Sequence, residues 1–255
     1  MAALTDQAIA EIKNLIMSGE FVAGSRLPKE QDLAQRIGLS RNSLREAVRA
    51  LTLIGVLEPR VGDGTYVTSL EPELLLTGMG FISDLLTGST LLELHQVRSI
   101  LEPVATELAT TQLDEAGFTA LEKCLADMDA AETTQAFIAA DEEFHRIVVT
   151  ASGNSTLASL IQNLSGGTLR ARLWRSVKER DAIEVTKRRH WDIYNALRDR
   201  DAKRAAAADL IHLSEGEQWL RQLMQAEDAL AVLATVPPDT DLSGNGDENA
   251  GTIRR

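Results

Sequence analysis

Apolar residues recur every three to four positions in three short segments near the start of the chain, 4–19, 33–37 and 41–51. This spacing is typical of amphipathic helices that bury one face. Gly19 and Gly38 end the first two segments, and a three-residue link leads into the third. Two short helices joined by a tight turn that contains glycine form a helix-turn-helix.

The periodicity changes after Gly55. Residues 56–60 and 65–68 have a strand-like pattern, and the sequence Val-Gly-Asp-Gly stands between them at 61–64. This pattern predicts a β-hairpin with glycines at its tip. Three helices followed by a hairpin constitute a winged helix, so we expect a winged helix-turn-helix domain over residues 1–69.

The rest of the chain is helical in pattern. An apolar, glycine-containing connector, partly helical, is expected at 70–88, followed by an almost continuous helical pattern over 89–225 and a Gly/Asp/Asn-rich tail at 226–255 that is expected to be disordered. The helical pattern predicts about six helices packed as a bundle, which makes the whole fold mainly α. The predicted breaks between the helices are 112–114, 132–134, 152–154, 180–181 and 199–201.

Three arginines, Arg41, Arg45 and Arg49, are spaced four residues apart on the third predicted helix. They fall along one side of that helix, next to its apolar stripe. Ser40 is a favourable N-cap, which places the first of them near the exposed start of the helix. Such a helix can enter a DNA major groove, where arginine bonds guanine O6 and N7 bidentately. The alternative is an ordinary solvated basic face.

The stretch GSRLPKEQDLAQRIGLSRNSLREAVRALTLIGVLEPRVGDGTYV resembles the N-terminal domain of the GntR family of bacterial transcription factors. The resemblance implies binding to double-stranded operator DNA through the recognition helix and the wing. Gln31 departs from it, because many relatives carry an arginine there, and so the operator sequence of a relative cannot be transferred unchanged. The predicted DNA-contacting residues are Arg26, Arg41, Asn42, Arg45, Arg49, Arg60 and Gly62.

The net charge of −12 is unusual for a DNA-binding protein, which ordinarily carries a basic patch. Residues 1–69 hold eight Lys/Arg and eight Asp/Glu, so the excess negative charge lies in the remainder. A neutral domain with clustered arginines predicts few phosphate contacts per subunit and a modest salt dependence. Two subunits that bind together would supply the affinity.

The remaining composition points to the cytoplasm. Cys124 is the single cysteine of the sequence, which excludes an intramolecular disulfide framework. No basic-then-apolar N-terminal segment indicates export, and no apolar run is long enough to cross a bilayer, so we expect no membrane partner.

The four histidines of the chain include three at informative places. Asp141 and His145 are four residues apart and project from one helix face, while His190 and His212 lie on later predicted helices. A bundle can bring such side chains together at one interior point, where three imidazoles and a carboxylate suit Zn²⁺, Ni²⁺ or Mn²⁺. Without a CxxC or HExxH motif, hydrogen-bonded buried histidines are the alternative.

The stretches HQVRSILEPVATELA, DEEFHRIV, RHWDIYNALRDRDAKRA and DLIHL resemble the FCD effector domain of the FadR subfamily of GntR regulators. The resemblance implies that Asp141, His145, His190 and His212 bind a divalent metal ion, with zinc the first choice. It also implies that Arg98 holds the carboxylate of an effector.

A small hydroxy- or sugar-acid fits this predicted site, because its oxygens can complete the metal coordination while Arg98 bonds its carboxylate bidentately. Trp174 is expected to wall the effector or, equally, to pack in the core, with Arg170 or Arg172 nearby. We expect Glu102 to orient Arg98 through a salt bridge. His95 is interpreted as a surface residue and not a ligand.

These predictions combine into a homodimeric regulator, not an enzyme, on a palindromic operator, with repression relieved by a metabolite as the default. Two alternatives remain. The bundle could be a metal-free sensor of an acyl-CoA or another apolar effector. It could also be a metal-dependent hydrolase fused to a DNA-binding domain, because three histidines and an aspartate around Zn²⁺ can activate water.

Overall fold

The protein consists of two compact units, Met1–Ile82 and Ser83–Arg255, each described here by itself. The structure is a computed structural model that describes residues 2–74, 76, 89–179, 181–225 and 242. Within those residues, no helix has both the length and the apolar character needed to cross a membrane.

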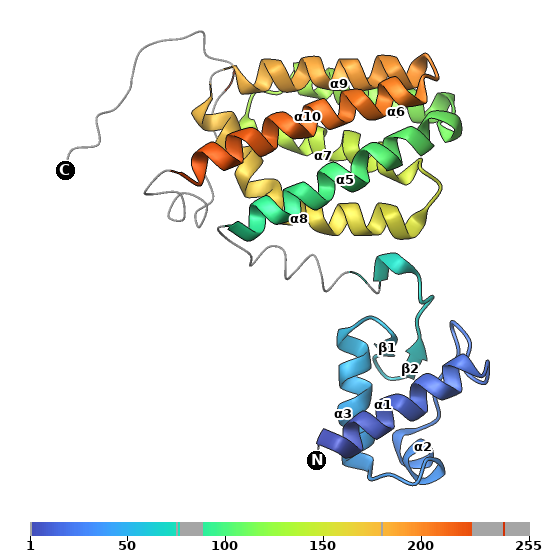
Figure 1. The fold of residues 1–255 in the computed structure, drawn as a ribbon. Helices are drawn as coiled ribbons and strands as arrows, with labels where there is room; N and C mark the ends of the chain where they lie inside the picture. The colour runs from blue at the N-terminus through green and yellow to red at the C-terminus, as the bar shows by residue number, and fades with distance from the viewer. Residues whose placement is uncertain (1, 75, 77–88, 180, 226–241, 243–255) are drawn as a thin grey trace, which may run out of the picture. The chain divides into compact units, whose positions relative to one another are not determined.

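Within the described residues 2–67, the first unit has three helices and a two-stranded hairpin, as predicted (Figure 1). The strands pair antiparallel, with Leu57 opposite Val67. Apolar side chains from the helices and both strands form one core, which includes the buried Ile12 and Leu44. The elements are α1 (Ala2–Met17), α2 (Glu30–Arg36), α3 (Arg41–Leu53), β1 (Leu57–Arg60) and β2 (Gly64–Val67).

The turn between α2 and α3 depends on Gly38 and Ser40. Gly38 has a φ of +70°, a left-handed conformation that glycine adopts without steric cost. The Ser40 side chain accepts a hydrogen bond from the backbone N–H of Ser43 at 3.1 Å, which caps α3. The predicted N-cap is confirmed, and it fixes where the arginine helix begins.

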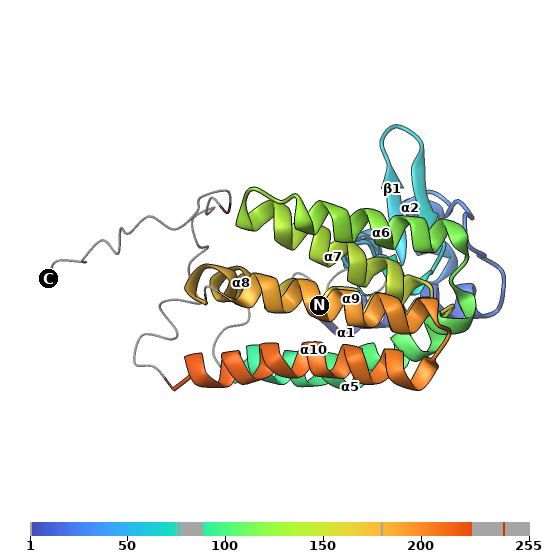
Figure 2. The same ribbon diagram turned by 90° about the horizontal axis from the view of Figure 1, so that it is seen from above.

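The described part of the second unit contains six helices, in agreement with the prediction. They form three layers, with α5 beside α10, α8 and α9 in the middle, and α6 beside α7 (Figure 2). Their bounds are α5 (Ser89–Gln112), α6 (Glu115–Asp129), α7 (Thr134–Thr150), α8 (Ser155–Lys178), α9 (Ala182–Arg198) and α10 (Ala202–Leu223).

Side-chain caps explain why the helices start where they do. Asp114, Thr133, Asn154 and Asp201 each accept a hydrogen bond from a backbone N–H in the first turn of the following helix. All four stand in or beside predicted breaks. The caps thereby set how α7 and α10, two of the helices that carry the candidate ligands, enter the bundle.

The predicted connector and tail lie mostly outside the described residues. Leu242 is the exception in the tail, where the prediction was disorder for all of 226–255. Its backbone N–H donates to the Glu132 carbonyl at 2.6 Å, and its partly buried side chain packs against the main core of the bundle. The chain therefore contacts the bundle at this point, because a leucine gains by covering apolar surface.

Candidate metal centre and DNA interface

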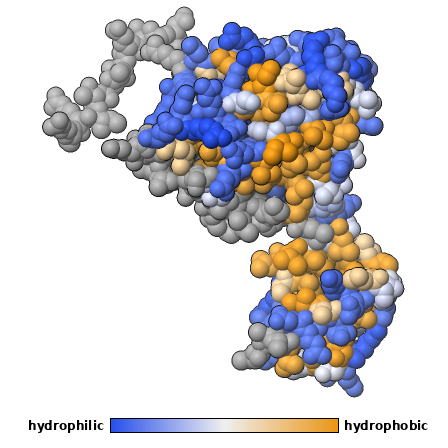
Figure 3. Space-filling model, viewed as in Figure 1, coloured by the Kyte–Doolittle hydropathy of each residue, from blue (hydrophilic) through white to orange (hydrophobic). Residues whose placement is uncertain are grey.

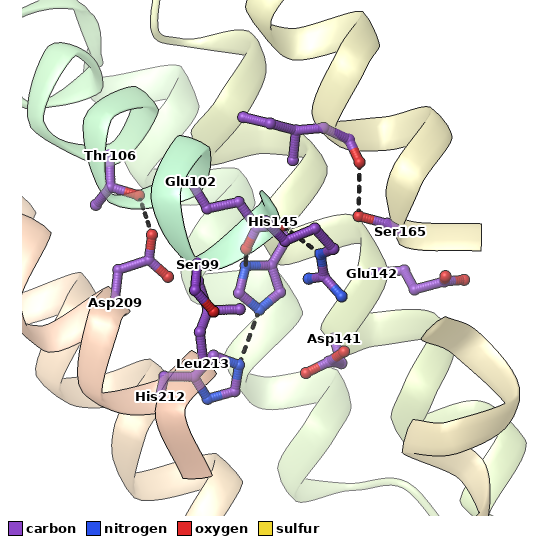
Figure 4. Close-up of polar contacts among 12 residues, drawn as sticks. Ser99, Glu102, Thr106, Asp141, Glu142, His145, Ser165, Asp209, His212 and Leu213 are labelled. Atoms are coloured by element: carbon purple, nitrogen blue, oxygen red, sulfur yellow. Dashed lines mark hydrogen bonds and ion pairs between the residues drawn. The ribbon is translucent and has the colours of Figure 1, made fainter. Parts of the chain in front are cut away.

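Four buried side chains converge inside the helical bundle. Asp141 and His145 come from adjacent turns of α7, His190 comes from α9 and His212 from α10. Each offers one ligand atom, and these atoms all lie within 4.8 Å of one another. Figure 4 shows Asp141, His145 and His212 pointing toward a common centre. The structure thus brings together the four residues that were predicted as metal ligands.

The spacing of the ligand atoms fits a tetrahedral cation. The Nε2 atoms of His145 and His212 are 3.2 Å apart, and His190 Nε2 is 3.2 Å from Asp141 Oδ1. A Zn²⁺ ion with ligands at about 2.0–2.1 Å has ligand–ligand distances of about 3.3 Å in tetrahedral geometry. These separations therefore match two opposite edges of a zinc coordination tetrahedron.

The tautomer of His190 strengthens this interpretation. Its Nδ1 lies 2.8 Å from the Thr186 carbonyl oxygen, which only accepts, so Nδ1 carries the hydrogen. In the neutral ring Nε2 then turns a lone pair toward the Asp141 carboxylate, and among the described residues it has no hydrogen-bond partner. A proton could satisfy this one pair of atoms. A cation satisfies all four converging ligand atoms at once.

The charge states of the cluster also suit metal binding. Burial lowers the pKa of His145 to about 4 and, with the neighbouring imidazoles, holds the pKa of His212 well below its ordinary value. Burial alone would raise the pKa of Asp141, but the Arg172 guanidinium together with His190 and His145 outweighs it and keeps this pKa well below its usual range. Neutral imidazoles and an ionised carboxylate are the forms that bind metal ions.

Arg172 lies beside the cluster, as predicted for Arg170 or Arg172. It donates to Asp141 Oδ2 at 2.5 Å and to Glu142 Oε1 at 2.9 Å. Because this arginine holds Oδ2, the other carboxylate oxygen of Asp141 is the one that faces His190. The side chain of Arg170 lies outside the described residues.

Arg98 is fully buried on α5, next to the cluster. Its Nε donates to Glu102 Oε1 at 2.8 Å, which confirms the predicted ion pair. Its Nη1 donates to Thr168 Oγ1 at 2.5 Å. Two of the nitrogens of this guanidinium are thus fixed in position, which orients the fork toward one direction.

A cavity of about 50 Å³ opens beside the cluster, with Arg98, Asp141, Thr168 and His212 in its wall. This volume has room for a few water molecules, since about 10–15 Å³ of such space is enough for one. Donors that suit a carboxylate and ligands that suit a cation therefore share one small space. An organic acid requires the helices or side chains around it to move apart.

The structure corrects the prediction for His95 and favours one of the two placements expected for Trp174. His95 was interpreted as a surface residue, but it is buried, lines the cavity and donates from Nε2 to the Leu213 carbonyl at 2.8 Å. Trp174 packs in the alternative manner, against an apolar cluster with Leu91, and is not part of the cavity wall. Trp219 occupies that wall position instead, because α10 and not α8 turns its tryptophan toward the cavity.

Sequence reasoning missed Thr186 and Thr168. Thr186 precedes His190 by one helical turn, a spacing at which its carbonyl is always near the imidazole, so the signal was available. Thr168 approaches Arg98 across 70 positions of sequence, and no local pattern announces such a contact.

The predicted DNA-contacting arginines lie on the surface of the first unit. On α3, Arg41 and Arg49 are well exposed and Arg45 is partly exposed, while Asn42 is also exposed. Arg41 and Arg45 both pair with Glu30 at the start of α2, at 3.7 and 3.2 Å. The arginine face is therefore accessible, and part of its charge is neutralised from within the domain.

The wing carries the remaining predicted contacts. Gly62, at the tip, has a φ of +76°, which explains the glycine there. Arg26 pairs with Asp63 at 3.4 Å, and a Cβ added at Gly64 would lie 2.7 Å from Arg26 Nε, so this glycine lets the arginine pack against the wing. Arg60 stacks over the Tyr66 ring at 4.1 Å.

Comparison with known proteins agrees with both parts of this description. Residues 4–67 match the family described as bacterial regulatory proteins, gntR family, and residues 93–215 match the FCD domain. The chain is 32% identical over 204 residues to the uncharacterised HTH-type transcriptional regulator YcbG of Bacillus subtilis, covering 79% of this chain and 83% of YcbG. The chain belongs to the gntR family. It is a DNA-binding transcription regulator with an FCD domain, and not an enzyme.

Two further relatives support the gntR assignment along nearly the whole chain. The HTH-type transcriptional regulator LutR of Bacillus subtilis is 29% identical over 218 residues, covering 81% of this chain and 96% of LutR. The solved structure of Streptococcus agalactiae GntR superposes with a TM-score of 0.53 at 27% identity, covering 84% of this chain and 99% of that one. The order of a winged helix and then a helical domain is therefore that of gntR regulators.

Proposed function

We propose that this gntR regulator is a repressor that leaves its operator when a small hydroxy- or sugar-acid binds beside a divalent cation in the FCD domain. The observation that carries the proposal is the convergence of four buried ligand atoms on a cavity whose wall also holds Arg98. A cation and a guanidinium beside one small space suit a ligand that has a carboxylate and a neighbouring hydroxyl.

We propose Zn²⁺ as the ion, held by Asp141, His145, His190 and His212, with Ni²⁺ or Mn²⁺ as the alternatives. Three nitrogen ligands and one oxygen ligand suit zinc, which can expand beyond four ligands to accept an effector oxygen. When bound, the ion supplies a positive centre that attracts carboxylate and hydroxyl oxygens.

The alternative of an acyl-CoA or other apolar effector has less support. The cavity of about 50 Å³ is lined by charged and polar groups such as Arg98, Asp141 and Arg172. Burying an acyl chain against these groups would leave their hydrogen bonds unmet. A small acid meets them and needs less expansion of the bundle.

We propose that two copies act together on a palindromic operator in the cytoplasm, because a two-fold dimer reads two half-sites. The bundle offers a surface for this pairing. Val97, Ile100, Val104 and Leu108 form an exposed apolar stripe along α5, and Ile100 is 69% exposed. Figure 3 shows apolar side chains gathered over α5 and α10. We propose a second copy of this chain as the partner, because it carries the same apolar stripe and the two stripes can cover each other.

The experiment selects DNA duplexes from a random pool with the zinc-loaded protein and then measures affinity for the enriched site by fluorescence anisotropy. We expect an enriched palindrome, and one acid from a panel that weakens binding about 5- to 150-fold, the usual range of allosteric coupling. An enriched site that responds to acyl-CoA and to no acid would overturn the effector class. Stronger binding with the acid would overturn the sign of regulation.

A further inference from the structure

Glu102 lies between Arg98 and the four converging side chains and is not one of the predicted metal ligands. It is fully buried on α5, and its Oε1 accepts the hydrogen bond from Arg98 Nε at 2.8 Å. Its other oxygen, Oε2, lies 3.7 Å from His145 Nδ1 and has no hydrogen-bond partner within the described part of the chain. Figure 4 shows the Glu102 carboxylate beside the His145 ring.

A metal ion would fix the tautomer of His145. The Nε2 atoms of His145 and His212 face each other at 3.2 Å, so both must be free of hydrogen when they bind one cation. The hydrogen of His145 must then sit on Nδ1, the atom that faces Glu102. A buried N–H without an acceptor costs about 1–3 kcal/mol, so Nδ1 requires a partner.

We propose that Glu102 is the positioning residue of the metal site, accepting the hydrogen of His145 Nδ1 through Oε2 while it holds Arg98 through Oε1. This inference rests on the proposed metal centre and deepens it. A single carboxylate would then connect Arg98, which binds the effector, to His145, a ligand of the cation. Binding of the effector and binding of the cation would thereby affect each other.

The surroundings of Glu102 support this role. Burial alone would raise the pKa of Glu102, but the Arg98 guanidinium together with His145 and Arg172 outweighs it and lowers this pKa, so the carboxyl stays ionised as an acceptor. His190 shows the same arrangement with a backbone acceptor, because its Nδ1 donates to Thr186. Carboxylate partners of this kind orient metal-binding histidines and make them more basic ligands.

A second arrangement of the same atoms must be distinguished. Glu102, His145 and Asp209 also have potential ligand atoms within 4.8 Å of one another. The ion pair of Glu102 with Arg98 argues against a second cation there, because the guanidinium already supplies a positive charge to this carboxylate. Asp209 bonds Thr106 at 2.7 Å, which ties α10 to α5 and gives it a structural role.

The test measures zinc affinity of the full chain in competition with a chelator, for the wild type, Glu102→Gln and the matched control Asp209→Asn. Both substitutions remove one buried carboxylate from the same cluster. Only the first affects the proposed acceptor of His145, because glutamine has one acceptor oxygen, which can serve Arg98 or His145 but not both. We expect Glu102→Gln to weaken zinc binding 10- to 100-fold and Asp209→Asn to change it less than about threefold. Glu102→Asp, which keeps the charge, should recover part of the loss.

A spectroscopic readout separates positioning from loss of stability. In ¹⁵N NMR of the zinc-loaded wild type, His145 should carry its hydrogen on Nδ1, and Glu102→Gln should change that signal while the His190 signal stays. Unchanged zinc affinity in Glu102→Gln would overturn the inference and leave the metal centre intact. If the wild type bound two zinc ions per chain and Asp209→Asn bound one, the result would overturn the inference and indicate a second cation site at Glu102. A wild type without zinc affinity would overturn this inference and the proposed metal centre together.

Discussion

Three buried imidazoles and a buried carboxylate facing one point form a costly arrangement unless something satisfies them together. His212 Nδ1 and His190 Nε2 have no hydrogen-bond partner among the described side chains and backbone, and both are desolvated. Each such atom costs about 1–3 kcal/mol. A cation bound through Nε2 of each histidine would satisfy His190 Nε2 and, because only the folded state binds it, would stabilise the protein by mass action.

Metal removal should therefore destabilise the protein. We expect zinc at 100 times its dissociation constant to add about 2.7 kcal/mol to the free energy of unfolding, and a chelator to remove it. In His190→Ala neither zinc nor chelator should change the free energy of unfolding, because one ligand is lost. The measurement is thermal unfolding with zinc or with chelator, and His95→Gln is the control, since this buried histidine lies outside the ligand set. Equal melting temperatures of the wild type in both conditions would exclude a metal centre that supports the fold.

His95 should make the metal-free protein sensitive to acid. Burial, with the nearby Arg98 charge, lowers its pKa to about 4 from 6.5. Between those two values the unfolded chain binds a proton that the folded chain does not, so stability falls as the pH falls. At 1.36 kcal/mol per pKa unit, we expect a loss of about 2 kcal/mol from pH 7 to pH 5 from this group.

His95→Gln tests this, because glutamine retains a donor for the Leu213 carbonyl and does not titrate. Urea unfolding at pH 7 and pH 5, both with chelator, should show a smaller loss of stability for the variant than for the wild type. The same loss in both proteins would place the acid sensitivity elsewhere in the bundle.

At this scale the sequence predicted the four converging residues but only part of their surroundings. The spacing of Asp141 and His145 placed both on one helix face, with His190 and His212 on later helices, and the FCD resemblance implied that all four bind a metal ion. His95 was misjudged, because its burial depends on α10 packing over α5, a contact across 118 positions of sequence. Helical periodicity shows which face of a helix is apolar, not which polar residue the next helix covers.

At the scale of the elements, two of the exposed arginines of α3 form ion pairs with the first residue of α2. Glu30 pairs with both Arg41 and Arg45, and the shorter contact joins Glu30 Oε2 to Arg45 Nε at 3.2 Å. Exposed ion pairs of this kind are worth about 0–1 kcal/mol. DNA phosphates must compete with Glu30 for the same guanidinium groups.

Glu30→Gln should therefore strengthen binding to DNA of random sequence. We expect up to about fivefold higher affinity at low salt, the equivalent of ~1 kcal/mol, and a steeper salt dependence. Glu20→Gln is the matched control, because Glu20 pairs with Arg36, which is not among the predicted DNA contacts. Anisotropy at two salt concentrations gives both quantities. Equal gains in the two variants would mean that only net charge matters.

The helix boundaries were predictable because capping is local. Ser40, Asp114, Thr133 and Asn154 all stand where the apolar periodicity stops, and each caps the helix that follows. The pairing of α5 with α10, and the three layers that result, had no such local signal. Layer order depends on which apolar faces match in three dimensions, as the contacts between distant helices show.

At the scale of the whole molecule, the account requires two copies on one operator. Ile100→Glu places a charge in the centre of the exposed α5 stripe, and we expect it to yield a monomer with at least about tenfold weaker operator binding. Met17→Glu is the control, because Met17 is 73% exposed on α1 and lies outside both the stripe and the predicted DNA contacts. Analytical ultracentrifugation measures the oligomeric state. A variant that stays dimeric would place the interface on another surface.

The most direct test of the central claim is the melting temperature of the zinc-loaded protein across a panel of hydroxy- and sugar-acids. The variants are Arg98→Lys, which keeps the charge beside Glu102 but loses the bidentate fork, and His145→Ala, which loses a metal ligand. We expect one acid to raise the melting temperature of the wild type by mass action and both variants to lose most of this shift. A shift that survives in His145→Ala, or no shift with any acid, would contradict the claim that a cation and Arg98 bind one effector together.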